Sequence, residues 1–321
     1  KSTAARTLVA ALALTHTPHE VQVFVIDFGG SFAGLRNLPH LAGLATRGEP
    51  EVIRRTAAEI TSLLNAREAY FREQGIDSID TYRTRRAQGV VDDGYGDIFL
   101  VVDGWATMRA DYESLEVAVQ EIAARGLSFG IHVIITANRW LEIRPAMKDL
   151  MGGKIELRLG DAGDSEIGRK AAGNVSALPG RGLDPSGLQM LTALPRIDGE
   201  TVPETLVDGV DDLVEKVISA WQREPGPKLR LLPQVLPLAE LQAHPAANPK
   251  QLLLGLDEAE LAPVGIDPTL EQHLFRYGDS GSGKSSMLRG LVHEITRRYE
   301  PGQARIFMLD YRRAHLGEIP E

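Results

Sequence analysis

The chain has 321 residues, enough for one large domain and part of a second, each able to bury its own hydrophobic core. Its 43% hydrophobic and 25% charged residues are typical of a globular protein, and the lack of cysteine argues against a disulfide-stapled secreted domain and thiolate metal sites. The net charge of −9 argues mildly against a surface that holds duplex DNA, so we do not expect nucleic acid as a partner. No run reaches the roughly 18 apolar residues of a membrane helix and no signal peptide precedes Lys1, which favours a cytosolic location.

Helical and strand patterns alternate along the first half of the chain. Residues 3–14 have the pattern of a helix, and the apolar run 21–26 predicts a buried strand that ends at Asp27. A second continuous apolar run, closed by Asp103, is typical of a strand buried on both faces of a parallel sheet. The run closed by Asp103 is the predicted strand 98–102, and the other predicted elements are helices at 51–73 and 115–124 and strands at 131–136 and 154–159. This order predicts an α/β fold with a doubly wound, mainly parallel sheet.

A composition shift divides the chain. Apolar residues at helical spacing predict a helix over 206–222, which ends before the Pro-Gly-Pro run at 225–227. The following stretch is rich in proline, alanine, asparagine and histidine, and we interpret 225–249 as a linker. The predicted domains are therefore 1–224, which lacks its first strand and the glycines of a phosphate-binding loop before Lys1, and 250–321, which is the amino-terminal part of a second domain of the same kind. In the second domain we expect a hairpin at 252–266 and a strand at 272–277.

A glycine-rich motif follows that last predicted strand. It matches the phosphate-binding pattern GxxxxGK[ST], whose glycines let backbone N–H groups turn inward on phosphate oxygens at the start of a helix. Lys284 would reach the β- and γ-phosphates, and the Ser285 hydroxyl would bind Mg²⁺. The candidate nucleotide-binding residues are Gly278, Asp279, Ser280, Gly281, Ser282, Gly283, Lys284, Ser285 and Ser286.

The tail of the same motif stands at the start of the chain, as Lys1-Ser2-Thr3. An offset of 283 residues aligns Lys1 with Lys284, and further identities follow without a gap. These identities pair Ser2 with Ser285, Arg6 with Arg289, Leu8 with Leu291, Val9 with Val292, Phe24 with Phe307, Asp27 with Asp310 and Gly34 with Gly317. The repeat predicts tandem nucleotide-binding modules. In the first module Lys1, Ser2 and Thr3 would then bind nucleotide, and Ser2 would also bind Mg²⁺.

Asp103 ends its apolar strand where a second metal-side group belongs, and we expect it to hold Mg²⁺ directly or through water. Nucleotide motors usually place an acid next, which polarises the attacking water, but the next residue is Gly104. We therefore expect the first module to bind nucleotide better than it hydrolyses it. Asp310, which aligns with Asp27, is predicted to be a strand end, because the counterpart of Asp103 would fall at 386, past residue 321.

Other polar residues have more than one interpretation. Thr136 ends the strand at 131–136 and Asn138 follows it, where a polar side chain often senses the γ-phosphate, although Asn138 could instead cap a turn. Arg139 is a candidate catalytic residue, and Arg125, Arg139 and Arg181 are either charges for a neighbouring subunit's nucleotide or ordinary surface arginines. His40 is predicted to be a structural loop histidine.

Several segments, in order, resemble those of the FtsK/SpoIIIE-type ATPases. They are the strand ending in Asp27, Leu38-Pro39-His40-Leu41, Arg67-Glu68, the runs 75–82 and 129–136, Asp164-Ser165 and Pro179-Gly180-Arg181-Gly182. The likeness covers nearly the whole chain. Asp27-Phe28-Gly29-Gly30 stands where the DNA translocases of that family tend to have Asp-Pro-Lys, and with the tandem modules it is more similar to the EccC group of type VII secretion ATPases.

This resemblance implies RecA-like domains that bind ATP with Mg²⁺. It also implies export of small WXG-type proteins recognised by their C-terminal signals, contact with the other ATPase domains of the same parent chain, and a higher oligomer such as a hexamer. The parent would be anchored in the cell membrane with these modules at its cytoplasmic face. Two alternatives stay open at this point: an FtsK-like double-stranded DNA translocase, and a substrate-binding scaffold without turnover.

Overall fold

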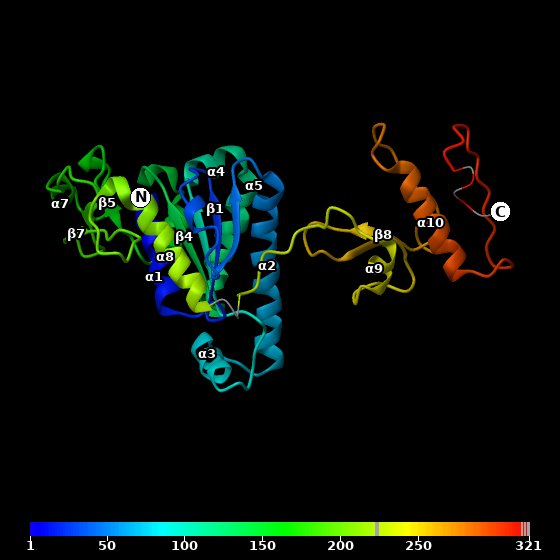
Figure 1. The fold of residues 1–321 in the computed structure, drawn as a ribbon, viewed down its shortest axis with the longest axis horizontal. Coiled ribbons are helices and arrows are strands. Elements are labelled where there is room, and N and C mark those ends of the chain that lie inside the picture. The colour runs from blue at the N-terminus through cyan, green and yellow to red at the C-terminus, as the bar shows by residue number, and fades with distance from the viewer. Residues whose placement is uncertain (222–224, 316, 318, 320–321) are drawn as a thin grey trace. The chain divides into compact units, whose positions relative to one another are not determined.

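The computed structural model describes residues 1–221, 225–315, 317 and 319. The chain forms two compact units, Lys1–Arg230 and Leu231–Glu321, which are described separately (Figure 1). The predicted domain boundary at 224 lies outside the described residues. Within the predicted linker 225–249, the Leu229 amide donates to the Ala42 carbonyl of the first unit, and residues 238–243 form a helix of the second.

The first unit is built on a four-stranded parallel sheet in the order β2-β1-β3-β4. The strands are β1 (Val21–Asp27), β2 (Leu41–Thr46), β3 (Asp97–Asp103) and β4 (Ile131–Thr136). The larger helices are α1 (Ser2–Thr15), α2 (Pro50–Glu73), α3 (Ile79–Ala87), α4 (Trp105–Asp111), α5 (Glu113–Gly126) and α8 (Leu206–Trp221). The predicted α/β fold with a mainly parallel central sheet is confirmed.

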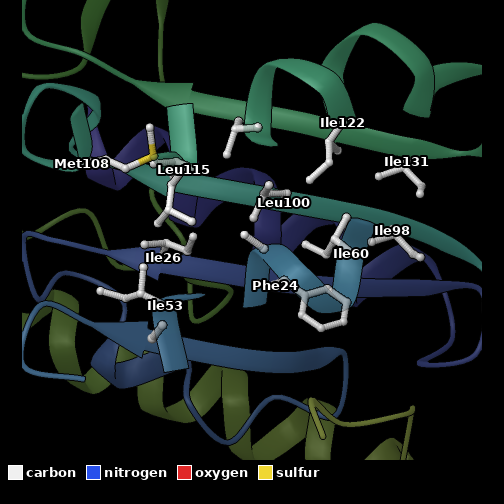
Figure 2. Close-up of a cluster of buried hydrophobic side chains, with 14 of the residues drawn as sticks. Phe24, Ile26, Ile53, Ile60, Ile98, Leu100, Met108, Leu115, Ile122 and Ile131 are labelled. Atoms are coloured by element: carbon white, nitrogen blue, oxygen red, sulfur yellow. The ribbon is translucent and has the colours of Figure 1, made fainter. Parts of the chain in front are cut away.

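Each face of this sheet buries its own core, because successive side chains of a strand point to opposite faces. Phe24 and Ile26 of β1 pack in one core with side chains of α2, α4 and α5. Figure 2 shows that core, where Ile53 and Ile60 from α2 and Leu115 and Ile122 from α5 meet residues of the strands. The alternate β1 residues pack in the other core with α1 and α8; these are Val21, Val23 and Val25. In Figure 1, α1 and α8 lie on one side of the sheet and α2 on the other.

A buried arginine ties α2 to the loop that leads into β3. Arg67 is 2% exposed, and its guanidinium donates to both carboxylate oxygens of Asp93, at 2.7 and 3.0 Å. It also donates to the carbonyls of Tyr95, Gly96 and Phe129, each at 2.9 Å. The guanidinium is therefore fully paired, as a buried charge must be.

The strand predicted at 154–159 does not join the parallel sheet. The structure has only the short β5 (Glu156–Leu157), which pairs antiparallel with β6 (Arg181–Leu183), and β6 pairs with β7 (Gln189–Leu191). The run 154–159 alternates polar and apolar residues, so it lacks the continuous apolar pattern of a strand that is buried on both faces of a parallel sheet. The Glu156 carboxylate is buried and accepts from Trp140 Nε1 and Ser165 Oγ, both at 2.7 Å.

Short helices complete the first unit around this smaller sheet and between the larger elements. The α-helices are α6 (Pro145–Leu150) and α7 (Arg169–Gly173), and the 3-10 helices are η1 (Ala33–Leu35), η2 (Leu127–Phe129), η3 (Trp140–Glu142), η4 (Ala162–Asp164) and η5 (Pro203–Thr205).

The second unit has the expected antiparallel hairpin, formed by β8 (Leu252–Leu256) and β9 (Pro263–Ile266). Its helices are α9 (Leu238–Ala243) and α10 (Lys284–Arg298). A buried carboxylate on α10 joins these elements: Glu294 accepts from the Leu253 amide of β8, at 3.3 Å, and from Gln242 of α9, at 2.5 Å. Arg297 and Arg298 on the same helix balance its charge.

Two strands predicted in the second unit are absent from its described residues, namely 272–277 and the run ending at Asp310. Their aromatic side chains are exposed, with Phe275 at 83% and Phe307 at 89%. In the first unit, β1 pairs along its whole length with β3, whose repeat counterpart would begin at 380, past residue 321. A strand needs such a partner for its backbone groups, so the prediction that Asp310 ends a strand is wrong for this chain.

Replacing Arg67 by Met should lower the free energy of unfolding by about 3 kcal/mol, because it removes the positive partner of the Asp93 carboxylate and the guanidinium donors to three carbonyls. Denaturant unfolding measures the change. The matched control is Arg72→Met on the exposed side of α2, where Arg72 is 77% exposed and a change within about 0.5 kcal/mol is expected. Equal effects of the two substitutions would contradict the role assigned to Arg67.

Acidification should destabilise the first unit through His40. This imidazole is 1% exposed, its Nε2 contacts the His16 carbonyl at 2.8 Å, and burial lowers its pKa. Below the unfolded pKa of about 6.5 the unfolded chain binds more protons, so the stability falls as the pH falls. In urea unfolding at several pH values, His40→Gln should reduce this dependence and the exposed His273→Gln should not. An unchanged pH dependence in His40→Gln would contradict the prediction.

Candidate functional site

Three polar residues meet at the carboxyl edge of the parallel sheet. Asp27 at the end of β1 is in register with Asp103 at the end of β3, and Asp103 is in register with Thr136 at the end of β4. Ligands of open parallel sheets bind at this edge. The register therefore gathers side chains that are up to 109 residues apart in the sequence.

Asp103 is the centre of this group and is 1% exposed. Its Oδ1 accepts from Ser2 Oγ at 3.1 Å and from Thr136 Oγ1. Ser2 is the first residue of α1, so the amino end of that helix, with its free N–H groups and positive dipole end, lies beside the carboxylate. The predicted metal-side residues Ser2 and Asp103 are thus brought together.

A cavity of about 130 Å³ lies at this edge. Its lining contains the predicted site residues Lys1, Ser2, Asp103 and Asn138. The remaining lining residues are Phe28, Gly29, Gly104, Trp105, Ala106, Thr107, Thr136, Ala137 and Glu142.

Other predicted residues do not line this cavity. Thr3 accepts a hydrogen bond from Arg6 at 3.4 Å. The Arg139 side chain is 61% exposed and pairs with Asp164 at 3.1 Å. Arg125 pairs with Glu68 and Glu121, and Arg181 lies in β6 of the smaller sheet.

The backbone at Gly104 explains why an acid would not fit easily there. Its φ is +105°, in the region that only glycine adopts readily, and it precedes α4 directly. A Cβ at this position would stand 3.1 Å from Cβ of Phe28, which is tighter than ordinary contact. The absence of the second acid is therefore built into the turn after β3.

Asp27 has a structural role at this edge. Its carboxylate accepts from the Gly29 amide at 3.1 Å and from the Phe32 amide at 2.8 Å. These bonds hold the loop after β1, and this loop places Gly29 next to Asp103, where a Cβ would be 3.5 Å from Asp103 Oδ2. Asp310 holds its own loop in the same way, accepting from the Ala314 and His315 amides at 3.1 and 2.8 Å.

Glu142, the second carboxylate of the cavity lining, was not predicted from the sequence. Its Oε2 accepts from the Asn138 amide at 2.9 Å, and its backbone carbonyl accepts from Arg109 of α4. These bonds fix the turn after β4 against the helix after β3. The spacing of four residues between Asn138 and Glu142, just past a strand end, was the only signal in the sequence.

The glycine-rich motif of the second unit forms a loop at the amino end of α10. Gly281 and Gly283 have φ of +81° and +82°, which only glycine adopts readily. Lys284 Nζ donates to the carbonyls of Gly278 and Asp279, at 2.5 and 2.6 Å, and so folds over its own loop. Ser285 and Ser286 follow in the first turn of α10.

The oxygen ligands that the first unit offers suit Mg²⁺ better than a metal ion that is coordinated by protein side chains alone. In the part of the chain that the structure describes, no group of three or more His, Cys, Asp or Glu side chains could hold a metal ion. Mg²⁺ is commonly bound by one or two carboxylates together with phosphate oxygens and water, and the pair of Ser2 and Asp103 matches that demand.

Among the described helices, none is long and apolar enough to cross a membrane.

Curated relatives of the chain are secretion proteins. It is 49% identical over 319 residues to the ESX secretion system protein EccC of Thermomonospora curvata, which covers 98% of this chain and 24% of the relative. It is 35% identical to the ESX-1 secretion system protein EccCb1 of Mycobacterium tuberculosis, covering 100% of this chain and 56% of that one. The chain therefore spans between about a quarter and just over half of these relatives.

Solved structures of EccC and EssC are also similar to this chain. The structure of Thermomonospora curvata EccC (ATPases 2 and 3) in complex with a signal sequence peptide matches with a TM-score of 0.91 and 49% identity, over 97% of this chain and 57% of that one. EssC (ATPases 2 and 3) from Geobacillus thermodenitrificans matches with a TM-score of 0.70 at 24% identity, over 93% of this chain and 57% of that one, which shows the fold alone. The family model described as FtsK/SpoIIIE family matches residues 1–198 and 244–321, well over half of the chain. The chain belongs to the FtsK/SpoIIIE family.

Proposed function

We propose that the chain is a pair of nucleotide-binding modules of a type VII secretion ATPase, which holds ATP with Mg²⁺ and hydrolyses it slowly. The observation that carries this proposal is the contact of Ser2, at the amino end of α1, with Asp103 at the carboxyl edge of the sheet, next to a glycine in place of an acid. Membership of the FtsK/SpoIIIE family supports nucleotide binding.

In the first module Lys1 and Ser2 would contact the phosphates and the metal, and Asp103 would hold the metal from the other side. In the second module Lys284 and Ser285 would act in the same way, and the phosphates would replace the loop carbonyls that now accept from Lys284. Bound Mg²⁺ would neutralise phosphate charge. Asn138, which lines the cavity, is our candidate for the γ-phosphate sensor, and Arg139 stays a candidate charge for a neighbouring subunit.

Slow turnover follows from residue 104. Without an acid there, no carboxylate directly after Asp103 can orient the attacking water or accept its proton, a contribution typically of about 10² to 10⁴ in rate. Bound ATP would then mainly fix the geometry of the module and its contacts with neighbouring ATPase domains.

Similarity to EccC supports the partners that we propose. A relative of the same two-module arrangement has been solved with a signal sequence peptide, so we propose that this chain takes part in recognising the C-terminal signals of small WXG-type proteins. We also propose that it works beside other ATPase domains of a membrane-anchored parent, at the cytoplasmic face, in a higher oligomer such as a hexamer.

Nucleotide binding and slow turnover are testable in a form of the protein that includes the glycine-rich residues expected before Lys1. With Lys284→Ala removing the second site, the protein should retain ATP in Mg²⁺ and hydrolyse it slowly. Asp103→Asn should weaken MgATP binding about tenfold, because a charged metal partner is lost. The exposed Asp149→Asn is the control. Gly104→Glu should lower the melting temperature without raising turnover, since φ at 104 is +105°.

Other outcomes decide between the alternatives. Fast hydrolysis that Asp103→Asn abolishes would contradict slow turnover. Hydrolysis stimulated by duplex DNA, with DNA binding that weakens steeply as salt rises, would favour a DNA translocase. Failure of the folded protein to retain ATP would favour a scaffold without turnover.

Peptide recognition is tested separately by calorimetric titration with the C-terminal peptide of a small WXG-type protein. Saturable binding is expected, and a scrambled peptide of equal composition should not bind. Peptide binding should persist in Asp103→Asn, because that substitution changes the nucleotide site. Failure of every such peptide to bind would count against the secretion function while leaving nucleotide binding intact.

A further inference from the structure

We propose that Thr136 is a positioning residue for the metal-side carboxylate of Asp103, and that it does not sense the γ-phosphate. This inference rests on the proposed nucleotide site of the first unit. It changes the interpretation of Thr136 that its place at the end of β4, beside Asp103, suggests.

The hydrogen bonds of the Thr136 hydroxyl carry the argument. Oγ1 donates to Asp103 Oδ1 and accepts from the Gly104 amide at 3.1 Å. A hydroxyl has one proton, so Thr136 has none left to donate to a phosphate oxygen. Its proton is engaged by a buried carboxylate, which makes the bond stronger than one between neutral groups. A γ-phosphate sensor would have to give up this bond.

The same bond determines which oxygen of Asp103 remains free. Oδ1 accepts from both Ser2 and Thr136, and no hydrogen bond from a described residue reaches Oδ2. Oδ2 faces Gly29, where the missing side chain leaves space. Thr136 is 8% exposed and Asp103 is 1% exposed, so both partners of this hydrogen bond are buried. The bond therefore holds the Asp103 carboxylate in one orientation, in which Oδ2 is available to the metal.

The second bond links this orientation to the turn after β3. The Gly104 amide would have no partner without Thr136, and this amide belongs to the glycine that turns the chain into α4 with φ of +105°. Thr136 therefore fixes the Asp103 side chain and the backbone next to it at once, across the β3–β4 pair.

The test compares Thr136→Val, which keeps the shape and removes the hydroxyl, with Thr136→Ser, which keeps the hydroxyl. Both are made in the Lys284→Ala background of the protein that includes the residues before Lys1. Affinities for fluorescent ATP and ADP analogues are measured in Mg²⁺ and in EDTA, with thermal unfolding as the folding check. Thr136→Ala replaces Thr136→Val if the latter does not fold.

Thr136→Val should bind both MgATP and MgADP about tenfold more weakly than the unsubstituted protein. Its affinity for the metal-free nucleotides should stay within about twofold of that protein. Thr136→Ser should have affinities close to those of the unsubstituted protein in all of these measurements. Weaker binding of ATP alone, with or without Mg²⁺, would assign Thr136 as a γ-phosphate sensor and overturn the inference. An equal loss in Mg²⁺ and EDTA, or no loss, would overturn it too. If the unsubstituted protein binds no nucleotide, the proposed function itself fails.

Discussion

The parallel pairing of β1, β3 and β4 is the constraint on which the first unit depends. Because the strands run in one direction and in register, the residues that end them, Asp27, Asp103 and Thr136, stand at one edge. The same pairing buries both faces of the sheet, so helices must cover each side, and α1 is one of them. Packing of α1 on the sheet brings Ser2 to Asp103. One pattern of backbone hydrogen bonds therefore builds the core and the site together.

Much of this arrangement could be predicted from the sequence. The apolar runs before Asp27 and Asp103 signal strands buried on both faces, and the repeat with the glycine-rich motif identifies Ser2. The partner choice of 154–159 could not be predicted, since strand pairing depends on segments distant in the sequence, here 181–183. Glu142 was missed for a similar reason: its contact with the Asn138 amide depends on a turn conformation that no periodicity encodes. The role that we propose for Thr136 could not be predicted from the sequence, because it depends on which group accepts the proton of the Thr136 hydroxyl.

The two repeats show which features are local. The loop after Asp27 and the loop after Asp310 have the same bond from the aspartate to the amide five residues on, at 2.8 Å in both. This loop forms although the strand before Asp310 does not, so its geometry is determined by nearby residues. The strand itself depends on a distant partner, as the exposed Phe307 shows when compared with the buried Phe24. Local chemistry is thus retained where the sheet is not.

The buried carboxylate of Glu294 has a consequence for the modules as parts. At the position that the repeat aligns with it, α1 has Ala11, which is exposed to solvent. Grafting α1 into the second unit would remove the acceptor for Leu253 and Gln242, and grafting α10 into the first would place a carboxylate where the chain has none. The repeat aligns α1 with α10 without a gap, yet α10 carries a buried acceptor that α1 lacks. The two helices are therefore not interchangeable, because α1 would leave two donors of the second unit without this acceptor.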